Sequence, residues 1–189
     1  NKAALATDKV VDYGAGATEL TIATGSDTDL TLTMEGSKGA LLQVAGEVTL
    51  DVFGFVQLEG SFAIEKSSNT VTLADPDGTG PEEAEEVDVD QLTIGATVTR
   101  AFAGINGGTD DQLGLELTGV EFGLSMMSEK TAAGSTTPAR TWTALQATVD
   151  SVGFVGIDAI TVAAKDISIQ INRASETNGE VVDFGVTEL

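Results

Sequence analysis

The chain has 189 residues, 41% of them hydrophobic, and its 30 acidic and 9 basic residues give a net charge of −21. This apolar content is typical of a folded chain, while the few Lys and Arg cannot build the basic face that nucleic acids and anionic membranes attract. Cys and His are absent, which excludes disulfides, thiolate chemistry, the Ser-His-Asp triad and zinc sites that use His. No apolar run approaches the roughly 18 residues of a membrane span, so we expect neither nucleic-acid binding nor membrane insertion.

Two short strands are expected first, because apolar and polar residues alternate in residues 18–23 and again in residues 29–34. Between and after them, residues 24–27 and 35–39 have the small, polar composition of turns. This pattern predicts a hairpin followed by a second turn.

The longest pattern in the chain covers residues 42–64, where every even position is apolar or Gly. A period of two held for 23 residues is typical of a β-strand, and a straight one would span roughly 75 Å. Ordinary strands have about five or six residues. We therefore expect this strand to be very long or bent, with Gly46, Gly54 and Gly60 as the places where bending costs least.

The rest of the chain continues the alternation. Further strands are predicted over residues 71–73, 87–102, 113–117, 120–126 and 142–171, and loops over residues 65–69, 75–86, 106–111 and 128–140. The apolar phase changes at Gly119, which predicts a bulge, and Gly153 and Gly156 are expected bends in the last segment.

No stretch has a helical period with start and stop signals. We predict an all-β fold, an elongated module of long, bent, mainly antiparallel strands with sandwich-like packing. A β-solenoid is the alternative, because strands that bend at Gly corners give the same sequence pattern.

The two ends of the chain share a motif. Residues 1–14 read NKAALATDKVVDYG and residues 172–185 read NRASETNGEVVDFG, an offset of 171 residues. Chance similarity over so short a stretch is one explanation. We favour a tandem repeat, in which residues 1–171 form one unit and residues 172–189 begin the next. A chain that begins with Asn instead of Met also fits a segment of a longer polypeptide.

Four stretches, residues 39–46, 52–66, 154–162 and 171–174, resemble the long tandem β-rich repeats of giant bacterial surface or secreted proteins of the adhesin and filament kind. The resemblance lies in the overall pattern and includes no catalytic motif. It implies stalks or surface layers outside the cell, built from neighbouring copies of the same unit.

The strongest candidate metal site is the acidic loop. Asp75, Asp77, Thr79 and Glu86 occupy positions 1, 3, 5 and 12 of an EF-hand-like calcium loop, with Gly80 at position 6. Hard oxygen ligands suit calcium, but strands instead of helices are predicted on both sides. A solvated acidic hairpin loop is therefore the main interpretation and calcium binding the alternative.

Other candidates are weaker. Phe53 and Phe55 lie on the otherwise polar face of the long alternating stretch, so we expect both faces to be covered there, with an interface between units as the alternative. Trp142 is expected to anchor the core or a loop. No pair among the 30 acidic residues is singled out for glycosidase-like catalysis.

We therefore expect a non-enzymatic structural unit, outside the cell or at its surface, that joins end to end with neighbouring copies. Whether copies also associate laterally is left open by the sequence. A calcium- or glycan-binding adhesin module is the second hypothesis, and a secreted carbohydrate-active enzyme is the third.

Overall fold

The computed structural model describes residues 3, 9–14, 16, 19–74, 85–157, 163–176 and 179–185. These residues form strands and one 3-10 turn: β1 (Leu20–Ala23), β2 (Asp29–Leu32), η1 (Gly36–Lys38), β3 (Leu42–Val52), β4 (Val56–Ala74), β5 (Glu85–Ile105), β6 (Leu113–Glu129), β7 (Thr141–Val155), β8 (Ala163–Ala174) and β9 (Val181–Val182). The all-β prediction is confirmed.

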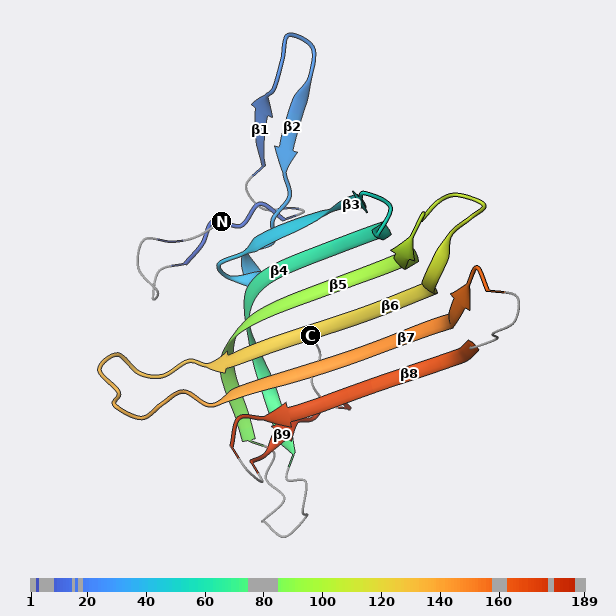
Figure 1. Cartoon of the computed structure of the whole chain (residues 1–189). Helices are drawn as coiled ribbons and strands as arrows, with labels where there is room; N and C mark the ends of the chain where they lie inside the picture. The colour runs from blue at the N-terminus through green and yellow to red at the C-terminus, as the bar shows by residue number, and fades with distance from the viewer. Residues whose placement is uncertain are drawn as a thin grey trace.

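Strands β3 to β8 follow one another across one sheet in chain order, and each pairs antiparallel with the next. Figure 1 shows them as a broad meander, with β1 and β2 standing apart as a separate two-stranded sheet. Strands that follow each other directly in a sheet are the usual outcome of short connections. The antiparallel prediction is confirmed, and the described strands do not form the coils of the alternative solenoid.

The longest alternating stretch of the sequence forms a hairpin. β3 ends at Val52 and β4 begins at Val56, and the backbone turns at Phe53 and Gly54, whose φ angles are 51° and 71°. Positive φ at two successive residues is typical of primed hairpin turns, and the Phe55 N–H donates to the Val52 carbonyl oxygen at 2.8 Å. The prediction of one continuous strand is wrong because Val52 and Val56 are opposite partners, so the period of two continues through the turn.

The tip of this hairpin exposes its aromatic side chains. Phe53 is 93% exposed and Phe55 is also exposed, so the expectation that both faces are covered there is wrong. The tip is held by backbone contacts, since the Gly107 N–H donates to the Gly54 carbonyl oxygen at 2.9 Å. Phe102 on β5 is fully buried near Gly107.

The polar residues 65–69 continue β4 instead of forming the predicted turn. Ser67 and Gln91, directly opposite each other on β4 and β5, are both buried. Gln91 Nε2 donates to Ser125 Oγ at 2.9 Å and Asn69 Nδ2 donates to Gln91 Oε1. The polarity of this stretch therefore serves a buried hydrogen-bonded layer, in which each polar group has a partner.

The phase change predicted at Gly119 is confirmed. Gly119 has a φ of 60°, and the pairing of β6 with β5 and with β7 passes over it. Because of this irregularity, Leu117 and Val120 lie on the same face of the sheet. In a regular strand, residues three positions apart would point to opposite faces.

The core lies at one end of the sheet. Figure 1 shows the lower ends of β4 and β5 turning away from the meander, next to β9. Seven apolar side chains from β4, β5, β6, β7 and β9 pack together there, namely Val71, Leu73, Val87, Val89, Met127, Trp142 and Val182. Ala144 and Ala174 pack against them. At this end the strands face each other in two layers, which confirms the sandwich-like prediction.

Beyond the core end the sheet has two unlike faces. The face that continues from the core, here called the concave face, carries the register-matched row Gln43, Glu65, Thr93, Ser125, Ala144 and Asn172. The opposite face, here called the convex face, carries the matched row Val44, Ile64, Ile94, Leu124, Leu145 and Ile171. No other described strand packs against the convex face, so a broad aliphatic surface is left in contact with solvent.

Candidate functional site

The predicted calcium loop falls mostly outside the described residues, which include Glu86 but not Asp75, Asp77 or Thr79. Glu86 lies on β5 opposite Thr72, with its side chain exposed. Within the described part of the chain, no group of three or more acidic residues is placed to hold a metal ion. The calcium hypothesis therefore stays a prediction.

The candidate site is formed by the residues that contact β9. This strand lies in the second copy of the repeated motif. Val182 pairs with Leu73 and Val181 pairs with Ala74 at the end of β4. The Asp183 N–H extends this pairing by donating to the Thr72 carbonyl oxygen at 2.9 Å. The Val182 side chain is only 1% exposed, so β9 contributes Val182 to the core.

Two side chains on neighbouring strands hold the backbone of this segment. Trp142 Nε1 donates to the Glu180 carbonyl oxygen at 2.9 Å, and Asn172 Nδ2 donates to the Val182 carbonyl oxygen at 2.7 Å. Trp142 is itself buried, so the sequence prediction of a core anchor is confirmed. Because both bonds go to backbone oxygens, they fix the position of the segment with little dependence on its side chains.

The turn that follows β9 is the same as the turn in the first copy of the motif. The Gly185 N–H donates to Asp183 Oδ1 at 2.7 Å, and the Gly14 N–H donates to Asp12 Oδ1 at 2.9 Å. Both are turns in which an Asp side chain bonds the backbone two residues on. The Gly36 N–H also donates to Asp12 Oδ1, at 2.8 Å, and these two backbone bonds hold the pKa of Asp12 below its usual value.

The two copies differ in what surrounds them. Val182 is 1% exposed, whereas Val11, at the equivalent position, is 49% exposed. The first copy is held by the segment after β2 instead, since the Tyr13 N–H donates to the Met34 carbonyl oxygen at 2.9 Å. The motif therefore makes the same Asp–Gly turn in two settings, one against β4 and one against the segment between β2 and β3.

An ion-pair cluster centred on Arg140 closes the same end of the sheet. Its guanidinium contacts Glu85 at 2.7 and 3.1 Å and Glu129 at 3.0 Å, and it lies over the Trp142 ring, 5.4 Å from the centroid. These hydrogen bonds lower the pKa of both carboxyls and raise the pKa of Arg140. The cluster links the start of β5, the end of β6 and the start of β7 around the core. No pattern in the sequence pointed to it, because its members are far apart in the chain.

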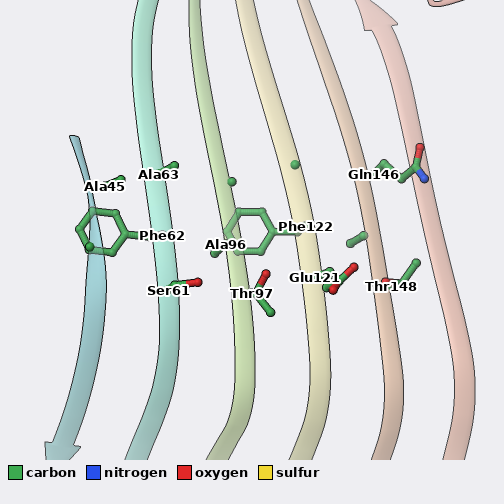
Figure 2. Close-up of a pocket in the computed structure, with 14 residues that line it drawn as sticks. Ala45, Ser61, Phe62, Ala63, Ala96, Thr97, Glu121, Phe122, Gln146 and Thr148 are labelled. Carbon is green, nitrogen blue, oxygen red and sulfur yellow. The ribbon is translucent and has the colours of Figure 1, made fainter. Parts of the chain in front are cut away.

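A shallow groove of ≈ 820 Å³ runs over the concave face. Its polar lining includes the amides and hydroxyls of Gln43, Thr93, Ser125, Gln146, Gln170 and Asn172, and Phe184 lies beside them. An adjoining hollow of ≈ 750 Å³ continues along the sheet. Figure 2 shows its row of Ser61, Thr97, Glu121 and Thr148 on neighbouring strands, and the Phe62 and Phe122 rings lying over the strands beside their own. Such a groove offers hydrogen-bond donors and acceptors to a ligand.

Among the described residues, no helix has the length and apolar character needed to cross a membrane. Comparisons with protein-family models, with curated proteins and with solved structures found no match.

Proposed function

We propose that the chain is a structural unit of a tandem array, part of a large protein outside the cell that forms a stalk, fibre or surface layer. The repeated motif is the observation that carries this proposal. Its two copies lie 171 residues apart and make the same Asp–Gly turn, and the second copy completes the core of the unit. A unit whose core needs the start of the next unit is suited to an array.

The proposed mechanism is mechanical. Long antiparallel strands provide a dense ladder of backbone hydrogen bonds, and the net charge of −21 keeps neighbouring arrays soluble. No catalytic step is part of this proposal.

Lateral association of copies belongs to the same proposal. The convex face presents aliphatic side chains from all six strands of the meander, and several of them, including Val44, Ile169 and Ile171, are exposed. Contiguous apolar surface of this kind is uncommon on monomeric proteins and marks interaction surfaces. A second copy of the unit, packed convex face to convex face, would remove both surfaces from water.

Two observations on the whole protein test the proposal. Antibodies raised against the chain should label intact cells that make the protein, without permeabilisation. Electron microscopy of a polypeptide with four copies of the unit should show straight particles of uniform length. Labelling only after permeabilisation would contradict the location, and globular particles without a common axis would contradict the structural role.

A binding module is the second candidate, and the groove on the concave face favours it. Side-chain amides and hydroxyls line the groove, which are the groups that bind the hydroxyls of a glycan. The acidic loop with Asp75 and Glu86 would add calcium in this interpretation. Screening the chain against immobilised glycans, with calcium and with a chelator, tests both parts; no binding in either condition would remove this candidate.

A further inference from the structure

We infer that residues 10–14 dock on the core end of another copy of this unit, in the way that residues 181–185 dock on this one. The shared segment would be the last strand of one unit and the first anchor of the next. This inference rests on the proposed tandem array and specifies how its units join. The partner is the end of β4 in a second copy, with the backbone of Thr72, Leu73 and Ala74 as the pairing edge.

The residues that dock are the same in both copies. Val10, Val11 and Asp12 correspond to Val181, Val182 and Asp183, so the first copy carries the same apolar side chain for the core and the same backbone donor for the pairing edge. The largest difference nearby is Lys9 in place of Glu180. At that position the carbonyl oxygen accepts from Trp142, which any residue can supply. The Glu180 side chain also hydrogen-bonds Glu85, and a Lys there would place an ammonium beside the Glu85 carboxylate. The first copy can therefore bind at the same position, against the end of β4 in another copy.

The two copies are held by different groups. In its own unit the first copy uses Asp12 Oδ1, bonded to the Gly36 N–H, and the Tyr13 N–H. The second copy binds β4 through the Asp183 N–H and the Val182 side chain. At the equivalent position in the first copy, the Val11 side chain is 49% exposed. Its burial in a preceding unit would remove this apolar surface from water, which favours docking.

The joint would also fix the position of the β1–β2 hairpin, which is separate from the main sheet. β1 and β2 form a two-stranded sheet with exposed Leu20, Ile22 and Leu30, and isolated hairpins are marginally stable in water. In an array this hairpin follows directly after the docked segment. Phe184 of that segment already lines the groove on the concave face, so the hairpin of the next unit would lie near this groove.

A two-unit polypeptide tests the joint, with residues 1–171 followed directly by residues 1–189. Residues 1–18 of the second copy then replace residues 172–189 of the first, and Asn1 and Ala3 stand where Asn172 and Ala174 were. The chain has no Cys, so single pairs of cysteines can be introduced cleanly. The test pair is Ala74→Cys in the first copy with Val10→Cys in the second. Directly opposite antiparallel residues lie within the Cα separation that a disulfide requires.

The control pair is Ala74→Cys with Val181→Cys, both in the second copy, whose pairing the structure shows. Under mild oxidation the test pair should form its disulfide at a rate within about tenfold of the control, because both pairs are tethered in one chain. A test pair that stays reduced while the control oxidises would overturn the inference. A second pair, Leu73→Cys in the first copy with Val11→Cys in the second, repeats the test at the neighbouring position, so that the result does not depend on the disulfide geometry of one pair. Absence of the test disulfide would leave the labelling of intact cells unchanged, whereas a wrong location for the protein would abolish that labelling whatever the state of the joint. The two failures are therefore distinguishable.

Discussion

Asp12 and Asp183 stand 171 residues apart in the sequence and make the same turn, each accepting a hydrogen bond from the N–H of the glycine two residues later, at 2.9 and 2.7 Å. Asp12 Oδ1 also accepts a hydrogen bond from the Gly36 N–H, in the segment between β2 and β3. Asp183 continues β9 along the edge of β4. One motif thus has two different surroundings in a single chain, as the repeat-unit proposal requires.

The first prediction concerns the burial of the second motif. Val182→Ala should lower the free energy of unfolding by about 2 kcal/mol, because it removes two methyl groups from a fully buried side chain of the core. Val11→Ala is the matched control at the equivalent position, which is half exposed, and should change stability by less than about 0.5 kcal/mol. Urea unfolding of the 189-residue chain measures both. Equal effects of the two substitutions would refute the assignment of β9 to the core.

The second prediction concerns pH. Arg140 holds the pKa of Glu85 and Glu129 below the ordinary Glu value of 4.5. The unfolded chain therefore binds protons more readily, so the stabilisation is present above pH 4.5 and is lost as the pH falls through the lowered pKa values. Arg140→Gln should remove this dependence, so that the stability difference from the unmodified chain shrinks towards acid pH.

Arg173→Gln provides the control for this experiment, because Arg173 is exposed on β8 away from the cluster. Chemical unfolding at a series of pH values between 3 and 7 gives the comparison. A difference between the Arg140→Gln and unmodified chains that stays constant over this range would show that the ion pairs do not titrate as inferred.

The third prediction concerns the convex face. Ile169 and Ser168 are neighbours on β8 that point to opposite faces, both exposed. Ile169→Lys should reduce self-association in sedimentation velocity, because it places a charge in the aliphatic surface. Ser168→Lys adds the same charge to the concave face and should leave association unchanged. If both variants sediment like the unmodified chain at every concentration, the convex face is not a contact between copies.

The fourth prediction concerns calcium. If the acidic loop binds calcium, the ion should raise the melting temperature, since a ligand that binds only the folded state stabilises it. Asp75→Ala with Glu86→Ala should abolish this increase, while Asp110→Ala in the β5–β6 turn should retain it. The site is excluded if the unmodified chain melts at the same temperature with calcium and with chelator.

Much of the fold was predictable from the period of two, which reports side-chain alternation directly. The turn at Phe53 and Gly54 was hidden because a connection between directly opposite residues preserves that alternation. The stretch around Ser67 was misread as a turn for a different reason. Its polar side chains form a buried hydrogen-bonded layer with Gln91, and such a layer can be recognised only when both strands are known.

The sequence also located the repeated motif but not its role in the core. Val181 and Val182 are too few residues to show the alternation that predicts a strand. Their partner strand, β4, lies about a hundred residues earlier in the chain. Long-range pairing of this kind carries no local signal. The Arg140 cluster was unpredictable for the same reason, because Glu85 and Glu129 reach it from different strands.

The proposed array requires that units join end to end through the repeated motif. The most direct measurement is small-angle X-ray scattering from polypeptides of one, two and three units, with and without calcium. Our account predicts that the longest dimension increases by a constant step with each added unit, because every joint has the same docked geometry. Scattering from compact beads on a flexible string would contradict it, and the chain would then be better explained as an independent binding module.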